Sequence, residues 1–337
     1  MINDLPGIAA VVRQARRPVI AGHVMPDGDC IGSVLGLGLI LEALDQQPTL
    51  VSADPVPLIY RFLPAADRFH VGHVPPGEYD LFIMLDCSVP ERLGDPVKLL
   101  LSRPGLKVVN IDHHISTQPF GDYNYIDAGA SAVGEIVYDL AGILNVPLTR
   151  EIAVCLYTAI LTDTGCFRYD NTTADTHRRV ARLIECGLSP AMVATAIYDE
   201  KPLSALRLLS AVLQTLRVSE PRRLGRLAWM RLTQAMERQV EAREEDTDGL
   251  INYARMVEGV EVALLFRETA DGKVKVGFRS KHAVDVSRLA GCFGGGGHPR
   301  AAGSVVEGSI DEVEAGIVAA ALETLDGGGS EGNGGHP

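Results

Sequence analysis

The sequence is short of basic residues and contains no apolar run long enough to cross a membrane. Its 31 Lys and Arg residues stand against 43 Asp and Glu residues, which gives a formal net charge of -12 at pH 7. Binding to a long nucleic-acid duplex uses many Lys and Arg side chains, so we expect no such partner. The apolar stretch from Ile31 to Leu44 is too short to span a bilayer and contains Glu42, so we expect no membrane partner either. Small anionic substrates are still compatible with this charge.

Paired cysteine motifs are also absent. The six cysteines are scattered without a CxxC pair: Cys30, Cys87, Cys155, Cys166, Cys186 and Cys292. No secretory signal precedes them, so a reducing compartment is expected, and we predict a cytoplasmic location. Cys30 and Cys87 each follow an Asp of interest, but a buried thiol more often packs as a small hydrophobic group. We leave both out of the predicted site.

The first half of the chain alternates strand and helix patterns. Apolar runs predict strands at Pro18–His23, Leu81–Asp86 and Lys107–Ile111, and a helix at Gly32–Leu44. This order predicts an α/β domain with a parallel sheet and flanking helices. Each predicted strand runs into acidic or histidine residues at its carboxyl end, where open α/β sheets bind their ligands.

A length of 337 residues exceeds the usual single core, so we expect two domains. Helical spacing runs through Glu135–Leu144 and Ile152–Leu161, and a second strand-rich unit follows. Its expected elements are strands at Leu224–Leu232, Val260–Arg267 and Lys273–Ser280 and a last helix at Ile310–Leu325. We therefore predict a catalytic domain over 1–187, a helical linker over 188–220, a smaller α/β domain over 221–326 and a disordered Gly-rich tail over 327–337.

Two candidate groups of ligands lie at the ends of the strands predicted at Pro18–His23 and Leu81–Asp86. His23, Asp27 and Asp29 lie within seven residues, and Gly28 allows a turn that brings the two carboxylates together. A polar turn that caps the next helix is an equally good interpretation of this segment alone. Asp86 ends a strand of buried type, where a charge is costly unless it is paired or bound to metal. Taken alone, an Asp in the following loop is the better explanation.

The third strand and a later helix supply the remaining candidates. Asp112, His113 and His114 end the strand, and consecutive imidazoles leave the backbone in different directions, so that one can bind metal while the other meets substrate. Asp163 is expected at the end of an apolar helix. The negative end of the helix dipole disfavours an unpaired carboxylate there, and a bound metal ion would offset this repulsion. The alternative for Asp163 is an exposed helix end with Gly165 as terminator.

Other motif-based sites are excluded by spacing. From Asp27, the fifth and twelfth positions of a calcium loop would be Ile31 and Gly38, which offer no side-chain oxygen. The glycines after Asp29 lack dinucleotide-binding spacing, and no Gly-Lys-Ser/Thr follows the later glycine run.

The remaining candidates form a metal set of two imidazoles and four carboxylates: His23, Asp27, Asp29, Asp86, His113 and Asp163. Such a set suits two divalent ions, with Mn2+ favoured over Mg2+, Fe2+ and Zn2+, and two ions can activate water for phosphoryl hydrolysis.

In the second predicted domain, cations and glycines lie beside one another. Arg279 and Lys281 end a strand, and Gly294–Gly297 precede His298 and Arg300. We expect the glycines to form a flexible backbone concavity whose amides can hold a phosphate. A solvated loop is the alternative, and without the first domain it would be preferred.

These motifs, in this order, resemble the DHH phosphoesterase superfamily with a C-terminal DHHA1 domain, and most closely its nanoRNase and pAp phosphatase group of the NrnA type. The resemblance covers residues 18 to about 325. It rests on HVMPDGDCIGS from His23, the strand-end Asp86, the DHH triplet, LTDTG around Asp163 and RSKHAVDVSRLAGCFGGGGHPRAAG from Arg279. Lys281, His282 and Ala283 depart from the small segment expected in that last motif.

The resemblance implies a role for each residue and an active site in the interdomain cleft. His23, Asp27 and Asp86 would hold one ion, and Asp29, Asp86, His113 and Asp163 the other. His114 and Asp112 would be the catalytic pair, with His114 facing the phosphate and Asp112 orienting the histidines. The implied substrate-binding residues are His114, Arg279, Ser280, Gly296, Gly297, His298 and Arg300. The resemblance also hints at a homodimer, which no motif in the sequence indicates.

The function implied is hydrolysis of very short single-stranded oligoribonucleotides to mononucleotides, together with conversion of 3'-phosphoadenosine 5'-phosphate (pAp) to AMP. Hydrolysis of cyclic di-AMP or of pApA by the same centre is the alternative. A RecJ-like single-strand exonuclease and a family II pyrophosphatase are less favoured, because of the acidic charge and the GGGH segment respectively. A non-catalytic nucleotide sensor is the alternative from another class.

Overall fold

The computed structural model describes residues 3–327, without the side chain of His298. It comprises two compact units, of which the first ends at Glu200 and the second begins at Lys201. Of the predicted disordered tail, only Gly327 lies among the described residues. Within residues 3–327 no single helix is long and apolar enough to cross a membrane. One helix pair, Ala174–Glu185 with Pro190–Asp199, meets that test only when joined across a bend of 110°.

The first unit is built on a six-stranded sheet in which every strand pairing is parallel. Its strands are β1 (Pro18–Ala21), β2 (Thr49–Ser52), β3 (His70–Val71), β4 (Leu81–Leu85), β5 (Lys107–Asp112) and β6 (Tyr123–Ile126). They lie in the order β3-β2-β1-β4-β5-β6. β4 is buried over its whole length, as expected for a strand covered on both faces.

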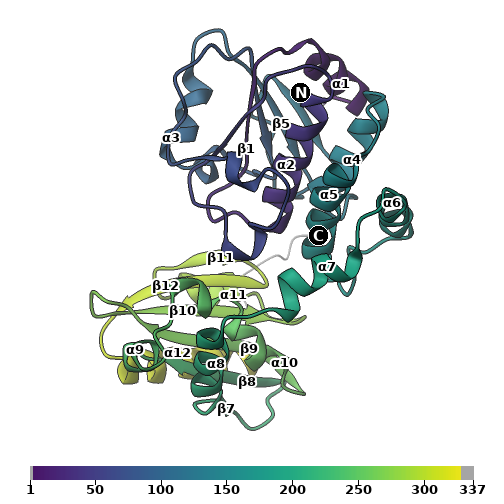
Figure 1. The fold of residues 1–337 in the computed structure, drawn as a ribbon. Helices are drawn as coiled ribbons and strands as arrows, with labels where there is room; N and C mark the ends of the chain where they lie inside the picture. Colours follow the sequence, from purple (N-terminus) through teal and green to yellow (C-terminus); the bar gives the residue numbers. More distant parts are fainter. Residues whose placement is uncertain (1–2, 328–337) are drawn as a thin grey trace, which may run out of the picture. The chain divides into compact units, whose positions relative to one another are not determined.

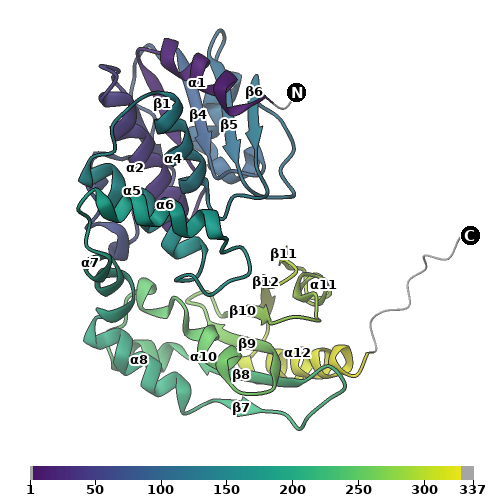
Figure 2. The ribbon, with the colours of Figure 1, turned by 90° about the vertical axis from the view of Figure 1, so that its right-hand side faces the viewer.

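Helices cover both faces of this sheet. They are α1 (Leu5–Gln14), α2 (Gly28–Glu42), α3 (Asp95–Lys98), α4 (Val133–Ile143), α5 (Arg150–Asp163), α6 (Ala174–Glu185) and α7 (Pro190–Ala194), with a π-helix at Thr195–Asp199 and short 3-10 turns at Leu58–Tyr60, Ala66–Arg68, Pro90–Leu93 and Leu99–Ser102. The large core lies on the face covered by α1, α2, α4 and α5, and a smaller core lies on the other face, beside α3 (Figures 1 and 2).

The strand order reverses between β1 and β4. From β1 the chain continues to β2 and β3 on one side, while β4, β5 and β6 extend on the other. In open parallel sheets the loops on either side of such a switch point diverge at the carboxyl ends of the strands and leave a ligand site there. The candidate ligands His23 and Asp86 follow β1 and β4, the two strands that flank this point.

A row of glycines brings α2 and α5 unusually close together. Gly28, Gly32 and Gly36 recur every four residues and share one face of α2. A Cβ atom at Gly32 would lie 2.5 Å from the carbonyl oxygen of Cys155 in α5, and one at Gly28 would overlap the side chain of Thr162. The close approach places the last residue of α5, Asp163, beside the first turn of α2.

Replacing Gly32 with Ala is therefore expected to destabilise the first unit by about 1–3 kcal/mol, because backbone atoms of α5 would have to move to admit the methyl group. Thermal or urea unfolding followed by circular dichroism measures this change. Gly142→Ala in α4 is the matched control, since a Cβ atom there meets nothing within 4 Å. In a helix, that replacement should stabilise by roughly 0.5–1 kcal/mol. Equal effects at the two sites would contradict the close helix contact.

The second unit is a smaller α/β domain around a mixed six-stranded sheet. Its strands are β7 (Arg217–Val218), β8 (Arg226–Leu232), β9 (Val260–Glu268), β10 (Lys273–Ser280), β11 (Gly296–His298) and β12 (Ala301–Glu307), in the order β11-β12-β10-β9-β8-β7. Only β8 and β9 pair in parallel. Its helices are α8 (Leu203–Leu213), α9 (Gln234–Gln239), α10 (Leu250–Met256), α11 (Val286–Gly291) and α12 (Ile310–Leu325), with a 3-10 turn at Glu244–Thr247.

The predicted parallel α/β domain followed by a smaller α/β domain is confirmed, with several local corrections. The helix predicted from Gly32 begins at Gly28, because Asp27 caps it. Strands β2, β3 and β6 of the first unit and strands β7, β11 and β12 of the second were not predicted. The glycines expected to form a flexible concavity instead include Gly296 and Gly297 in β11, which pairs with β12. The segment predicted as a linker, 188–220, contains α7, the π-helix, α8 and β7.

Candidate metal centre

His23 and Asp27 lie where the chain leaves β1 and enters α2. The Asp27 carboxylate caps α2 by accepting a hydrogen bond of 3.0 Å from the Cys30 amide. The Nδ1 atom of His23 donates to the carbonyl oxygen of Val24 over 2.7 Å. This contact leaves Nε2 as the free ring nitrogen, 3.3 Å from Asp86 Oδ2 and 3.7 Å from Asp27 Oδ1. These three residues form the first group of ligand atoms able to surround an ion.

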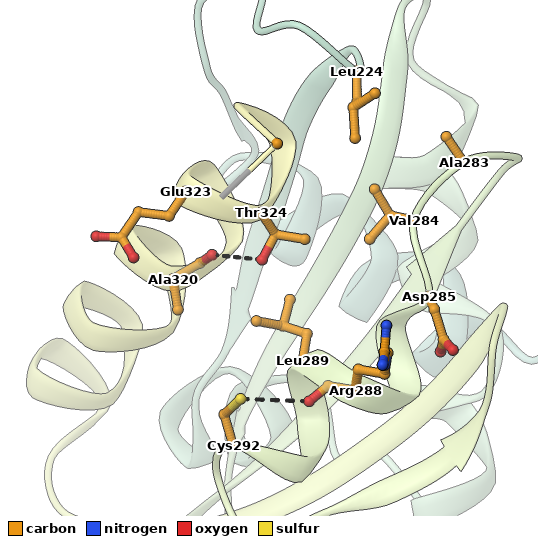
Figure 3. Close-up of a pocket in the computed structure, with 11 residues that line it drawn as sticks. Leu224, Ala283, Val284, Asp285, Arg288, Leu289, Cys292, Ala320, Glu323 and Thr324 are labelled. Carbon is orange, nitrogen blue, oxygen red and sulfur yellow. Dashed lines mark hydrogen bonds between the residues drawn. The ribbon is translucent and has the colours of Figure 1, made fainter. Parts of the chain in front are cut away.

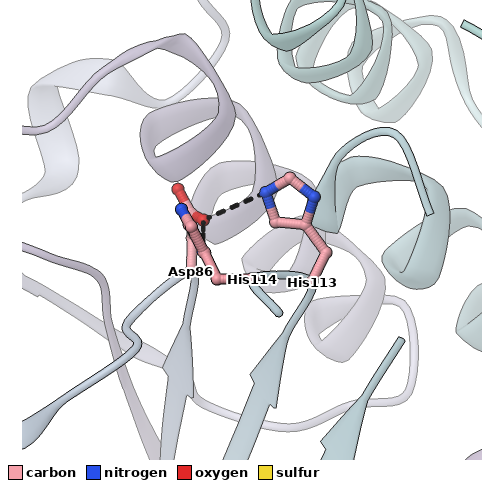
Figure 4. Close-up of side chains that lie close together, drawn as sticks. All are labelled: Asp86, His113 and His114. Atoms are coloured by element: carbon pink, nitrogen blue, oxygen red, sulfur yellow. Dashed lines mark ion pairs between the residues drawn. The ribbon is translucent and has the colours of Figure 1, made fainter. Parts of the chain in front are cut away.

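Asp86 follows β4 with a left-handed backbone, at φ +57°, and only 2% of the residue is exposed. Non-glycine residues seldom adopt this conformation, and those that do often lie at functional sites. Its Oδ1 atom lies 3.7 Å from His113 Nε2 and 3.5 Å from His114 Nδ1 (Figure 4). Within residues 3–327, this buried oxygen has no hydrogen-bond partner. Burying a carboxylate oxygen without a hydrogen-bond donor costs free energy. A cation bound at this position would offset that cost.

His113 is the centre of the second group. Its Nδ1 atom donates to the carbonyl oxygen of Ala130 over 3.2 Å. Its Nε2 atom lies 3.8 Å from Asp29 Oδ2 and 3.6 Å from Asp163 Oδ2. As at His23, a backbone carbonyl fixes one ring nitrogen and leaves the other as the available ligand, which is the usual arrangement of metal-binding histidines.

Asp29 is bound to the start of α4 as well as facing the second group. It is 1% exposed, and its Oδ2 atom accepts the Val133 amide over 2.7 Å. Its Oδ1 atom accepts the Gly134 amide over 3.0 Å and the Ser33 hydroxyl over 2.8 Å. The side chain therefore caps one helix while projecting from the first turn of another, and its position is fixed by both.

Asp112 orients its two histidine neighbours. Its Oδ1 atom accepts the His113 amide over 2.7 Å and His114 Nδ1 over 2.8 Å, and its Oδ2 atom accepts the Thr117 hydroxyl. Asp112 itself is fully buried. The side chain of His114 is 28% exposed, and its Nε2 atom makes no hydrogen bond within the described part of the chain. Asp112 thus supports His114 and leaves one ring nitrogen free to meet a substrate.

The carboxylates give this edge of the sheet a strongly negative potential. Burial alone would lower the pKa of His23, but contacts with Asp27 and Asp86 outweigh it and raise the pKa to about 10. The same competition, between burial and the charges of Asp29, Asp163 and Asp86, raises the pKa of His113 to about 9. Burial, reinforced by neighbouring carboxylates, raises the pKa of Asp29 well above its usual range. A negative field of this kind also favours the binding of divalent cations.

The residues present fit a pair of divalent ions. Two groups, His23 with Asp27 and Asp86, and Asp29 with His113 and Asp163, each offer three ligand atoms within 4.8 Å of one another. A third group joins Asp86 to His113 and His114. The donors are imidazole nitrogen and carboxylate oxygen, which suit Mn2+, Mg2+, Fe2+ or Zn2+. Cys30 and Cys87 are buried and unpaired and belong to none of these groups.

All six sequence-predicted ligands thus lie together, but the groups that orient them were not predicted. These are the backbone carbonyls of Val24 and Ala130, the amides of Val133 and Gly134, and the hydroxyl of Ser33. Backbone groups carry no side-chain signal in a sequence. Ser33 lies four residues after Asp29, a helical spacing that could have indicated its contact.

In the second unit, the residues predicted to bind substrate surround the loop after β10. Ser280 is buried, and its hydroxyl donates to the carbonyl oxygens of Val284 and Pro299. Arg300 donates to the same Val284 carbonyl over 2.7 Å, and Arg279 donates to that of Phe278. Ser280 therefore supports the loop in this structure, while each guanidinium keeps further donors available.

A buried carboxylate holds the other side of this loop. Glu261 in β9 is 5% exposed, and its Oε1 atom accepts the amides of His282, Ala283 and Val284 over 3.0, 2.6 and 2.9 Å. Three consecutive amides around one oxygen form an anion-binding nest. Here the protein's own carboxylate fills it, so these amides are not free for a phosphate. This is the segment in which the sequence departs from its expected motif.

The predicted glycines differ in what surrounds them. A Cβ atom at Gly297, which has φ +143°, would lie 2.6 Å from the carbonyl oxygen of Ala301, so close pairing of β11 with β12 requires glycine there. A Cβ atom at Gly296 would meet nothing within 4 Å. Strand packing therefore explains why glycine is needed at Gly297 but gives no reason for glycine at Gly296. The backbone at Gly296 is open to a ligand. The side chain of His298 lies outside the described part of the structure.

A pocket of about 420 Å3 lies elsewhere in the second unit, between α11 and α12 (Figure 3). Leu289 and Ala320 contribute apolar surface, and Arg288 and Glu323 contribute charge. None of Arg279, Ser280, Gly296, Gly297 and Arg300 lines it. The pocket is therefore not lined by these residues, although its lining residue Val284 accepts hydrogen bonds from Ser280 and Arg300.

Comparison with known proteins agrees with this arrangement. Residues 17–160 match the model of the DHH family N-terminal domain, and residues 232–326 match that of the DHHA1 domain. A Thermus thermophilus protein named bifunctional oligoribonuclease and PAP phosphatase NrnA is 36% identical over 94% of this chain and 93% of its own length. The chain belongs to this DHH–DHHA1 family. The family predicted from the sequence motifs is thereby confirmed.

Two further relatives of this DHH–DHHA1 protein cover nearly its whole length. The Bacillus subtilis bifunctional oligoribonuclease and PAP phosphatase NrnA is 30% identical over 91% of this chain and 94% of its own. The crystal structure of an exopolyphosphatase-related protein from Bacteroides fragilis superposes with a TM-score of 0.89, at 25% identity and 96% coverage of both chains. Both units of the fold are therefore shared with proteins of known sequence or structure.

Proposed function

We propose that this DHH–DHHA1 phosphoesterase hydrolyses very short single-stranded oligoribonucleotides to mononucleotides and pAp to AMP. The observation that carries the proposal is the convergence of two imidazoles and four carboxylates at the switch point of the parallel sheet. The names of the Thermus thermophilus and Bacillus subtilis relatives support the substrate class. The net charge of -12 agrees with small substrates rather than long duplexes.

His23, Asp27 and Asp86 would hold one divalent ion, and Asp29, Asp86, His113 and Asp163 the other. We propose Mn2+ as the preferred ion, on the basis of this mixed set of nitrogen and carboxylate donors. When bound, two such ions make water nucleophilic and neutralise charge on the phosphoryl oxygens. Asp86 is the residue best placed to be shared, because its two oxygens face different histidines.

His114 would meet the reacting phosphate. The hydrogen bond between His114 Nδ1 and Asp112 fixes the imidazole ring, so that Nε2 points away from Asp112. From that position His114 can hydrogen-bond a phosphoryl oxygen or give a proton to the leaving ribose oxygen as the phosphorus–oxygen bond breaks. The proton is balanced by the one that the attacking water loses.

We further propose that the second unit holds the distal nucleotide through Arg279, Arg300 and the open backbone of Gly296. Arginine side chains bind phosphate with two parallel hydrogen bonds, and a glycine lets a ligand approach the backbone. A cytoplasmic location fits six cysteines that are all unpaired.

A substrate panel tests the proposal. The purified chain, supplied with Mn2+, is expected to release mononucleotides from RNA dinucleotides and phosphate from pAp, as measured by chromatography. Cyclic di-AMP and pApA, a longer single strand and pyrophosphate are assayed in parallel. Cleavage of cyclic di-AMP without cleavage of pAp or dinucleotides would favour the alternative phosphodiesterase. Binding without turnover of any substrate would identify a nucleotide sensor.

A further inference from the structure

We propose that Arg92 binds the phosphate undergoing hydrolysis, which makes it a further catalytic residue of the first unit. The inference rests on the proposed phosphoesterase function. Arg92 lies in the 3-10 turn Pro90–Leu93, six residues after Asp86. Neither its sequence neighbourhood nor its spacing singled it out.

The backbone of Arg92 is fixed against the loop that carries His23 and Asp27. Its carbonyl oxygen accepts the Val24 amide over 2.6 Å, and its own amide donates to Val89 over 3.1 Å. Two residues later, Gly94 has φ +76°, and a Cβ atom there would lie 2.9 Å from the Val24 side chain. The turn therefore packs tightly on the metal-binding loop and holds Arg92 at the ligand edge of the sheet.

The turn that carries Arg92 lies at an accessible edge of the metal centre. Asp27 is a proposed ligand whose side chain is 56% exposed. The Val24 amide lies between His23 and Asp27 in the sequence and donates to the Arg92 carbonyl, so the side chain of Arg92 starts beside this accessible ligand.

Arg92 has no protein acceptor for its charge. Among residues 3–327, no ion pair or side-chain hydrogen bond involves its guanidinium, although the residue is partly buried. Arg16 and Arg150 in the same unit also lack such contacts with their side chains, but both are exposed to water. A partly buried guanidinium whose five donors contact no protein group is available to an external anion, which would offset its partial burial.

A phosphate is the anion that this environment favours. A guanidinium can donate two parallel hydrogen bonds to phosphoryl oxygens, whose charge increases as the transferred group approaches its transition state. Divalent ions at the neighbouring carboxylates would attract the same group. The alternative is that Arg92 only offsets the negative field of the carboxylates from a distance, in which case substrate would not contact it.

Kinetics of Arg92→Ala test the proposal on pAp and on bis(4-nitrophenyl) phosphate, which has one phosphate and no nucleotide. We expect kcat/KM to fall about 100- to 1000-fold on both, as for loss of a donor to transition-state charge. Metal content and melting temperature should be unchanged. Arg92→Lys should recover only part of the activity, because an ammonium cannot make the paired contact. Added guanidinium ion should partly rescue Arg92→Ala.

Arg103→Ala is the matched control. Arg103 is also partly buried in the first unit, but it donates to Gly77 and lies over the ring of Tyr79. It should retain wild-type kinetics.

Three results would overturn the assignment of Arg92: unchanged kinetics in Arg92→Ala, a loss confined to pAp, or a loss of metal that accounts for the fall. A wild-type protein that cleaves bis(4-nitrophenyl) phosphate but neither pAp nor dinucleotides would instead refute the proposed substrates. The Arg92 comparison would still be decisive on that simple diester.

Discussion

Asp86→Asn is expected to abolish phosphoester hydrolysis while leaving the fold intact. The replacement keeps the side-chain volume, and Asn tolerates the left-handed backbone found at Asp86. It removes the charge of a carboxylate that lies 3.3 Å from His23 and 3.7 Å from His113. Changes to groups that merely support a metal ligand typically cost about 10- to 100-fold in affinity or activity. Loss of a shared ligand should therefore cost more than about 100-fold in turnover, with a matching fall in bound metal.

Metal content after loading with Mn2+ and desalting, measured by mass spectrometry, gives a readout independent of activity. Asp45→Asn is the matched control, because Asp45 also has a left-handed backbone, at φ +60°, but lies in none of the three ligand groups. It should keep both metal and activity. An Asp86→Asn protein with normal metal content and normal turnover would rule out Asp86 as the shared ligand.

His114→Ala is expected to lower kcat by about 100- to 10,000-fold while both ions stay bound, because the lost group acts on substrate rather than on metal. Steady-state kinetics on pAp together with metal analysis measure this effect. The geometry makes the result informative, since His114 also lies in one of the three groups able to hold an ion. If His114→Ala loses an ion, the side chain is a ligand and its proposed role is wrong.

His70→Ala is the control for His114→Ala. His70 is exposed in β3 and contacts His73 edge to face, outside the ligand groups. Asp112→Asn adds a further comparison. It should reduce kcat less than His114→Ala does, because the imidazole would be present but poorly oriented.

The strands that carry the site could be predicted from sequence because they are buried. β1, β4 and β5 are apolar runs that lead into charged residues. β3 has only two residues, both exposed, and β6 carries the buried polar residue Asn124. β3 is too short to show a pattern, and in β6 the polar Asn124 is the buried residue between two tyrosines, which reverses the usual alternation. These edge strands owe their conformation to pairing with neighbours.

The proximity of Asp163 to Asp29 depends on packing that no local pattern shows. Their helices approach each other at Gly28 and Gly32, where the lack of a side chain permits the close contact. A missing side chain gives no pattern in the sequence that would indicate this contact. The residues of the glycine run were misjudged for a similar reason. Gly297 permits a close strand pairing, whereas the sequence alone suggested flexibility.

The hydrogen bonds between Asp29 and the first residues of α4 offer a way to observe the centre in solution. The amide protons of Val133 and Gly134 are held by the same carboxylate that faces His113 and Asp163. Any change in charge around that carboxylate alters the strength of these two bonds. Their hydrogen-exchange rates and amide chemical shifts thus report on occupancy of the centre from the start of a helix that contributes no ligand of its own.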